Sequence, residues 1–405
     1  MEWKEVTLGE VSSKIGDGLH GTPKYDDEGS YFFINGNNLN CGKIIIKDDT
    51  KRVGIEEFVK NQKELNEQTI LVSINGTIGN VAKYNNEPCI LGKSACYINV
   101  IKEVDKEFIY YILTSANFKR NITNEATGTT IKNVSLKQMR EYKFNIPCNL
   151  ADQRRIASIL SSLDRKIELN NKINADLEEM AQAIFKNWFV DFEPFKDGKF
   201  VDSELGMIPE GWKVGTIGDI VEFQNGFTFS SKDFSENGEY KIITIKSVQD
   251  GCLVTEGSSK VTEYPTKMPA YCKLQSGDIL LSLTGNVGRC CLVTETNLLL
   301  NQRVAKIKAK ECYDNSFSYA LFRLKETKEL LISISRGTAQ ANLSPVEASK
   351  LPMVIPSEDA RKSFSMISDS IMNKIISIHI ENSRISLLRD TLLPRLMSGE
   401  LEVPE

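Results

Sequence analysis

The chain has 405 residues, of which 41% are hydrophobic and 26% are charged, and its net charge at neutral pH is −4. This length exceeds one ordinary domain, and the apolar share suffices for two folded cores. No apolar run reaches the roughly 18 residues of a membrane span, and no secretion signal opens the sequence. The nine cysteines are scattered, and His20 and His379 are the only two histidines. We therefore expect a cytoplasmic protein with reduced thiols, no metal site and no histidine-based catalysis.

Residues 1–150 are expected to form the first domain. Strand-like runs read YFFIN, KIIIK, TILVSI and CYINVI, and a helix is expected around KEFIYYILTSANFKRNI. Between two apolar runs, residues 73–80 read SINGTIGN. This segment lacks the lysine of a phosphate-binding P-loop and precedes another apolar stretch, so it predicts a tight turn with glycine at positive φ. The alternative is that its Ser, Asn and Thr side chains face a ligand.

Residues 151–190 are expected to form one long helix. Apolar residues recur there in alternating steps of four and three, which is typical of a coiled coil. Asn170 and Asn174 interrupt this seam near its middle. The seam positions are Ile156, Leu160, Leu163, Ile167, Asn170, Asn174, Leu177, Ala181, Ile184 and Trp188.

After a linker at residues 191–211, the first domain is repeated at residues 212–356. Matching residues keep one offset of 209 positions, from Trp3 and Trp212 to Pro147 and Pro356. The turn returns as SLTGNVGR at residues 282–289. A constant offset over this length indicates duplication of a whole domain. Residues 357–398 are expected to form a second long helix with Asn382 near its middle, and residues 399–405 a tail.

Five segments carry a resemblance to a known family. They read EWKEVTLGEV, DGLHGTPKY, LADQRRIASILSSLDRKIELNN, SELGMIPEGWK and LLRDTLLPRLMSGEL. With them, essentially the whole chain resembles the specificity subunit of type I restriction–modification systems. The resemblance implies an α+β fold: two homologous, mixed β-rich target-recognition domains, joined by two long antiparallel coiled-coil helices in a pseudo-twofold tandem repeat.

The same resemblance implies a function without catalysis. Each domain would read one half of an asymmetric, bipartite site in double-stranded DNA. The helices would set the spacer and dock two methyltransferase subunits, and two restriction and motor subunits would join. S-adenosylmethionine, ATP and Mg would be used by those partners, so we expect no cofactor and no metal on this chain. If the helices are antiparallel, Asn170 and Asn174 should lie near Asn382 and fix their register.

The residues independently indicate that the chain has no catalytic centre. It holds neither an NPPY-type methyltransferase motif nor a Walker lysine. Asp233, Glu239 and Lys241 resemble the carboxylates and lysine of a nuclease, but this pattern is degenerate and the first copy does not keep it. A bivalent scaffold that binds proteins or glycans is the alternative to a DNA reader.

Long polar side chains in loops are the candidates for contact with base edges. For each of them the competing interpretation is a solvated loop residue. The candidates are Lys24, Asn35, Asn37, Asn38, Asn75 and Lys132 in the first copy, and Lys246, Asn286, Arg289, Gln302, Arg303 and Gln340 in the second.

Overall fold

The computed structural model describes residues 1–126, 132–337 and 341–403. The chain forms two compact units, Met1–Lys166 with Ile385–Glu405, and Ile167–Arg384. Each unit contains one of the expected domains together with a part of both long helices. The units therefore divide within the helices and not at the ends of the expected domains.

The first unit is built around a four-stranded antiparallel sheet and a smaller mixed sheet. The larger sheet has the order β2 (Ser12–Asp17), β10 (Ala95–Val100), β7 (Thr69–Ser73) and β8 (Val81–Lys83). The smaller has the order β6 (Arg52–Val53), β3 (Tyr31–Ile34) and β9 (Cys89–Leu91), with β3 and β9 parallel. Two short pairs add β1 (Trp3–Thr7) with β11 (Lys143–Pro147), and β4 (Leu39–Asn40) with β5 (Lys43–Ile44).

Helices cover one face of the larger sheet. They are α2 (Lys106–Thr114), α3 (Ala116–Glu125) and α4 (Leu136–Glu141), while α1 (Ile55–Asn61) lies near the smaller sheet. Phe108 and Phe118 are fully buried there, beside Ile156 and Leu160 of α5 (Leu150–Phe189). Asp105 and Ser115 accept hydrogen bonds from the first turns of α2 and α3 and so cap both helices.

The second unit repeats this plan. One sheet has the order β15 (Val221–Asn225), β22 (Val304–Ala309), β19 (Ile279–Ser282) and β20 (Cys290–Leu292). The other has β17 (Lys260–Val261), β16 (Tyr240–Ile243), β21 (Leu298–Leu300) and β18 (Lys273–Leu274). The remaining strands are β14 (Lys213–Thr216) with β23 (Pro352–Ile355), and the helices are α6 (Ile217–Ile220), α7 (Asn315–Arg323), α8 (Lys325–Ser333) and α9 (Pro345–Ser349).

The duplication expected from the sequence holds at the level of single elements. β3, β8, β9, β10 and α2 each reappear 209 residues later with identical bounds, as β16, β20, β21, β22 and α7. The parallel pairing of β3 with β9 also recurs between β16 and β21. The tandem repeat of an α+β domain is therefore confirmed.

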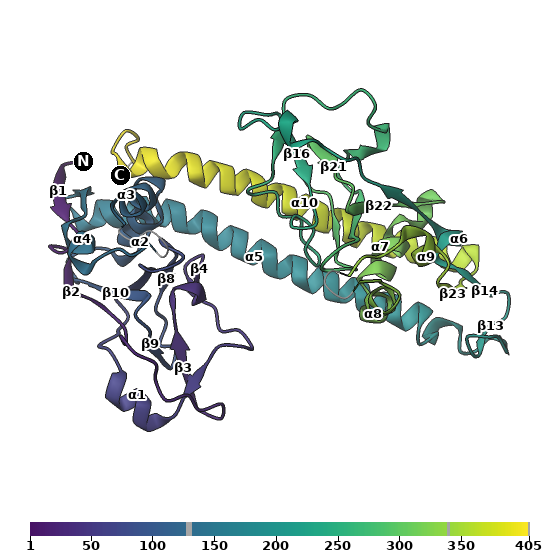
Figure 1. Cartoon of the computed structure of the whole chain (residues 1–405), viewed down its shortest axis with the longest axis horizontal. Helices are drawn as coiled ribbons and strands as arrows, with labels where there is room; N and C mark the ends of the chain where they lie inside the picture. The colour runs from purple at the N-terminus through teal and green to yellow at the C-terminus, as the bar shows by residue number, and fades with distance from the viewer. Residues whose placement is uncertain (127–131, 338–340, 404–405) are drawn as a thin grey trace. The chain divides into compact units, whose positions relative to one another are not determined.

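Two helices of 40 residues each, α5 and α10 (Glu358–Met397), carry the coiled-coil seams. In the second unit Asn170 contacts Asn382, and Phe185 packs on Phe364 with ring centroids 5.7 Å apart, so partner numbers fall along α10 as they rise along α5. In the first unit Ile156 and Leu160, near the start of α5, share a core with Leu396 and Met397 at the end of α10. The two helices are therefore antiparallel within each unit. Figure 1 shows α2 and α3 beside the first part of α5, and α7 beside its last part. No helix of the described chain is long and apolar enough to cross a membrane.

A short hairpin follows α5. It consists of β12 (Phe200–Val201) and β13 (Ile208–Pro209). Trp212 lies next to it and packs against Phe189, Phe192 and Phe195, with ring centroids 4.9–5.9 Å apart. These aromatic contacts fix the end of α5 on the second domain.

Candidate nucleic-acid interface

The glycine-rich segments are tight turns between strands, as the sequence predicts. In the first unit the turn joins β7 to β8, and Gly76 and Gly79 have φ of 74° and 87°. The fully buried Ser73 accepts a hydrogen bond from the amide of Asn80 at 2.9 Å and donates to the Thr77 carbonyl. A side chain at either glycine would be strained at these angles. The backbone of this turn is therefore held from inside by one serine.

The second unit keeps this arrangement with different side chains on the turn. Gly285 and Gly288 have φ of 74° and 81°. Ser282 accepts from the amide of Arg289 at 3.1 Å and donates to the carbonyl of Asn286. The backbone is thus common to both units, while position 80 carries asparagine and its equivalent, position 289, carries arginine.

Three further loops of the first unit meet the turn. The amide of Gly36 donates to Ser94 Oγ over 2.8 Å, and the Ile74 amide donates to the Ser94 carbonyl over 3.0 Å. Asn75 Nδ2 donates to Asn133 Oδ1 over 3.1 Å. Together these segments form what we call the first loop cluster, residues 35–42, 74–80, 92–94 and 132–135.

The second loop cluster comprises residues 244–251, 283–289, 301–303 and 341–344. The Leu283 amide donates to the Arg303 carbonyl over 3.0 Å. Thr284 Oγ1 donates to Asn342 Oδ1 over 2.9 Å, at the positions equivalent to Asn75 and Asn133. Equivalent contacts thus hold equivalent loops together in both units.

The first cluster brings together five of the six candidates from the first copy and leaves Lys24 outside. Asn37 and Lys132 are exposed, and Asn75 is half-buried. Asn38 is buried; its Nδ2 donates to the Ile45 carbonyl over 3.0 Å, and its Oδ1 accepts from the Asn35 amide over 3.0 Å. Since Asn38 is enclosed by its own loop, we remove it from the proposed base contacts.

Asn35 also has a structural role. Its Oδ1 accepts a hydrogen bond from Ser94 Oγ over 3.0 Å, and a Cβ placed on Gly92 would lie 2.1 Å from this oxygen. The half-buried Asn35 side chain therefore fixes the loop at residues 92–94, and we remove it from the proposed base contacts as well.

In the second copy, Lys246, Asn286, Gln302 and Arg303 are exposed within the second cluster. Gln302 Oε1 accepts from Thr228 Oγ1 over 2.6 Å. The half-buried Arg289 donates from Nη1 to Gln249 Oε1. Gln340 lies outside the described residues.

Sequence reasoning missed several cations at these clusters. Lys119 of α3 and Lys328 of α8 are 209 positions apart, and their Cγ atoms lie 3.4 and 3.0 Å from the Cβ positions of Gly79 and Gly288. The constant offset was the signal that would have found them. Lys93 and Arg336 are also exposed at the clusters, Lys93 next to Ser94 and Arg336 bonded through its backbone to Asn342.

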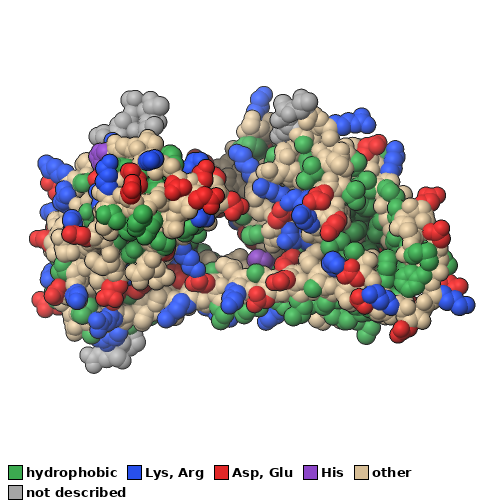
Figure 2. Space-filling model, turned by 90° about the horizontal axis from the view of Figure 1, so that it is seen from below, with side chains coloured by type: hydrophobic (Ala, Val, Ile, Leu, Met, Phe, Trp, Pro, Cys, Tyr) green, Lys and Arg blue, Asp and Glu red, His purple; other side chains and the backbone are tan. Residues whose placement is uncertain are grey.

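Neither unit shows an extended basic surface in the view of Figure 2, where basic and acidic side chains are interspersed. The face drawn there therefore has mixed charge. The individual cations at the loop clusters suit contacts to single phosphates and base edges.

The three seam asparagines, Asn170, Asn174 and Asn382, are buried within the second unit. Asn170 Nδ2 donates to Asn382 Oδ1 over 2.8 Å and to Glu381 Oε2 over 2.8 Å. Asn382 Nδ2 donates in turn to Asn171 Oδ1 over 2.8 Å. Asn174 is also buried, but neither of its side-chain polar atoms has a hydrogen-bond partner among the described residues. Of the two asparagines expected near Asn382, Asn170 is therefore the one that forms a hydrogen bond with it.

The nuclease-like residues do not form a catalytic group. Lys241 pairs with Glu295 over 2.7 Å, and Glu239 accepts from Asn297 over 3.2 Å, while Asp233 is exposed in a separate short helix. No cluster of three potential metal ligands occurs among the described residues. Burial raises the pKa of the Cys290 and Cys291 thiols, which makes both weak nucleophiles.

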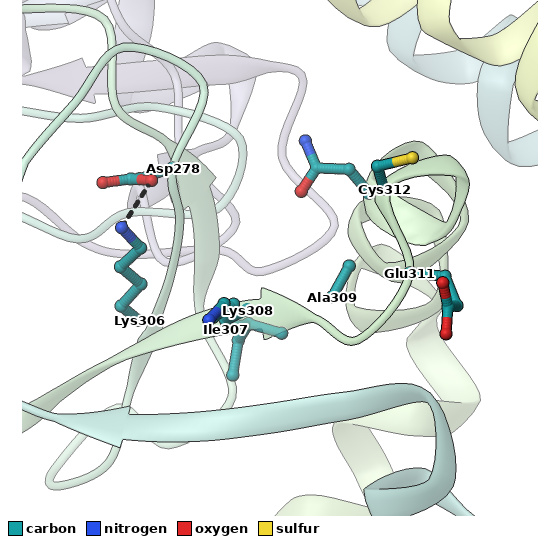
Figure 3. A pocket seen from close by; sticks show the side chains of 8 residues that line it. Asp278, Lys306, Ile307, Lys308, Ala309, Glu311 and Cys312 are labelled. Carbon is teal, nitrogen blue, oxygen red and sulfur yellow. Dashed lines mark ion pairs between the residues drawn. The ribbon is translucent and has the colours of Figure 1, made fainter. Parts of the chain in front are cut away.

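A shallow concavity beside β22 also lacks a convergent set of polar groups. It is lined by eight residues, among which Lys306 and Asp278 form an ion pair over 2.8 Å. Figure 3 shows this pair on one side, with Glu311 and Cys312 on the other side and directed elsewhere. The lining therefore offers no arrangement that would orient a small ligand.

Comparison with known proteins places these features in a family. Residues 1–179 and 209–385 match the family described as type I restriction modification DNA specificity domain. The type I restriction enzyme MjaIX specificity subunit of Methanocaldococcus jannaschii is 27% identical over 95% of this chain and 87% of its own length. The HindI specificity subunit of Haemophilus influenzae is 26% identical, over 73% of this chain and 77% of its own.

A solved structure shares the fold. It is the S subunit of a type I restriction–modification system from M. genitalium, with a TM-score of 0.54 and 19% identity over 98% of this chain and 96% of that one. The family match covers both copies of the repeat and most of both long helices. The chain therefore belongs to the family of type I restriction–modification specificity subunits.

Proposed function

We propose that this chain reads an asymmetric, bipartite sequence in double-stranded DNA, one half with each domain. The observation that supports this most directly is the pair of loop clusters, which share a backbone but differ in their side chains. Asn80 and Thr77 of the first turn correspond to Arg289 and Asn286 of the second. Two domains that present different donors and acceptors on the same loop backbone suit a DNA site whose two halves differ in sequence.

In this proposal the long helices set the distance between the half-sites. The polar contacts between α5 and α10 support a fixed register, because the hydrogen bond of Asn170 and the ion pair of Asp164 with Arg389 would both be lost if one helix slid along the other. A shift by one heptad moves a helix by about 10 Å. That is roughly three base pairs of DNA at about 3.4 Å each.

The helices also carry apolar side chains that suit the docking of two methyltransferase subunits. Leu169 and Met180 of α5 are 55% and 52% exposed, and Met366 and Leu387 of α10 are 80% and 70% exposed. In this proposal these exposed side chains would be covered by the methyltransferase subunits. Two restriction and motor subunits would complete the complex. The partner subunits would supply S-adenosylmethionine, ATP and Mg chemistry, and this chain would bind no cofactor.

The test is to exchange residues 1–150 for the first domain of another family member and to reconstitute the chain with its methyltransferase subunits. Sequencing of the methylated DNA should show one changed half-site and one retained half-site. The unmodified complex serves as the control. A change in both halves would contradict the assignment of one domain to each half.

A second measurement separates a DNA reader from a scaffold. The reconstituted complex should bind its duplex in a strongly salt-dependent way. The purified chain alone should neither methylate nor cleave DNA. Methyl transfer without a partner subunit would overturn the non-catalytic role, whereas binding of a protein or glycan without any DNA binding would favour the bivalent scaffold.

A further inference from the structure

The second loop cluster holds one side chain in an arrangement suited to a single base. Arg289 lies on the glycine turn after β19, and its Nη1 donates to Oε1 of Gln249. Gln249 in turn donates from Nε2 to the Lys246 carbonyl over 2.8 Å. Because this carbonyl can only accept, the amide orientation of Gln249 is fixed with its oxygen toward Arg289. One donor of the guanidinium is thereby used, and no other hydrogen bond from the Arg289 side chain occurs among the described residues.

The turn that carries Gln249 is itself tied down. Asp250 accepts from Lys328 Nζ over 2.5 Å and lies 3.5 Å from Arg323 Nη1. Arg323 also pairs through Nε with Glu178 of α5 over 3.1 Å. A Cβ on Gly251, which has φ of 75°, would lie 2.9 Å from Arg323 Nη2. The turn that carries Gln249 is thus connected to α5 through the contacts of Asp250 with Arg323 and of Arg323 with Glu178.

The first unit differs at these two positions. The residues 209 positions before Gln249 and Arg289 are Asn40 and Asn80. Asn40 ends β4, two residues before Gly42, whose φ of 80° is close to the 75° of Gly251. Arginine favours guanine O6 and N7, and asparagine favours adenine N6 and N7. Equivalent positions on the two turns therefore carry side chains that suit different bases.

We propose that Arg289 reads a guanine in the half-site of the second domain, and that Gln249 is a positioning residue that presents the guanidinium for a bidentate contact. This inference rests on the proposed function. A pre-oriented guanidinium loses less conformational freedom on binding, so its discrimination depends on the hydrogen bond that it donates to Gln249.

The experiment uses the full complex with methyltransferase subunits, a duplex library randomised over the half-site of the second domain, and sequencing of the methylated products. Arg289→Ala should reduce discrimination at one base position by about 5- to 150-fold. Arg289→Lys keeps the charge but loses the planar fork, so it should relax the same position. Lys267→Gln removes an exposed charge in the loop after Tyr264, whose ring packs on Tyr240 at the start of β16, and should leave the motif unchanged.

Two variants test the positioning role. Gln249→Met removes the acceptor and should relax the base position that Arg289 reads, whereas Gln249→Glu keeps an acceptor and should retain it. The double variant Gln249→Met/Arg289→Ala should be no less specific than Arg289→Ala alone, because Gln249 acts through Arg289. Thermal unfolding of each variant would confirm that it is folded.

The outcomes separate the two proposals. If the unmodified complex methylates a defined motif and Arg289→Ala leaves every base preference intact, the inference is wrong and the proposed function stands. The inference is also wrong if Arg289 contacts a phosphate. In that case Arg289→Ala would weaken methylation of all sequences without changing the motif, and Arg289→Lys would keep near-normal activity. If the unmodified complex shows no sequence preference, the proposed function itself fails.

Discussion

Asn170 and Asn382 meet across the two long helices, with Nδ2 of the first donating to Oδ1 of the second over 2.8 Å. Both side chains are buried, 1% and 9% exposed, in a seam that is otherwise largely apolar. A buried amide pair of this kind costs stability relative to apolar packing but selects one register, because any other register leaves the amides without partners.

Replacing both partners, as Asn170→Leu/Asn382→Leu, should change the free energy of unfolding little or raise it, since no buried amide of the pair is left unsatisfied. Asn170→Leu alone should lower it by about 1–3 kcal/mol, because Asn382 Oδ1 then loses its donor. Spacer preference is measured by methylation of duplexes whose half-sites are one to three base pairs closer or farther apart. The double variant should methylate duplexes with a wider range of spacer lengths. An unchanged range would show that this pair of asparagines does not fix the register of the helices.

Asn174 should behave differently from Asn170. Its amide is buried without a hydrogen-bond partner among the described residues. Asn174→Leu should therefore raise the free energy of unfolding by about 1–3 kcal/mol, which is the usual cost of an unsatisfied buried polar group. The midpoint of thermal unfolding should rise accordingly, with Asn187→Leu on the exposed side of α5 as the matched control. A lower midpoint for Asn174→Leu would show that the amide has a stabilising role.

His379 predicts a loss of stability in mild acid. Burial lowers the pKa of this imidazole, and nearby Glu178 only partly opposes the shift. The unfolded chain then binds the proton more readily than the folded chain, so stability falls as the pH drops below the ordinary histidine pKa of about 6.5. Thermal unfolding between pH 7.5 and about pH 5 should show a smaller decrease for His379→Gln than for the unmodified chain. Equal decreases would contradict the prediction.

Thiol reactivity tests the placement of the cysteines. Cys41, Cys148 and Cys312 are exposed and should react quickly with an aromatic disulfide reagent at neutral pH. Cys252 is exposed as well, but burial around its sulfur raises its pKa, so it should react more slowly. The buried cysteines should react only in denaturant; they are Cys89, Cys96, Cys272, Cys290 and Cys291. For Cys89, burial raises the pKa to about 12. Rapid modification of any buried thiol in the folded chain would show that its core is open.

The repeat and the seam could be predicted because both are periodic. A constant offset of 209 residues aligns strands whose individual patterns are short, and heptad spacing places Asn170 and Asn174 on the buried side of α5. The division into compact units could not be predicted, because it depends on which half of each helix packs against which domain.

Pairing within the loop clusters was also beyond the sequence. Asn38 and Asn37 are adjacent and chemically identical, yet one is enclosed by its loop and the other is exposed. Only the path of the backbone distinguishes them. Gln249 and Arg289 are separated by 40 residues, and no local pattern connects them. By contrast, comparing the two copies position by position would have singled out Lys119 and Lys328.

The serine inside each glycine turn has a consequence for how such a protein evolves. Ser73 and Ser282 hold the turn from below through hydrogen bonds to backbone groups, so this support does not depend on which side chains stand at positions 77, 80, 286 and 289. Mutations at the outward positions can then accumulate with little effect on folding. Substitutions there can thereby change the donors and acceptors that the turn presents, while the duplicated scaffold beneath them stays unaltered.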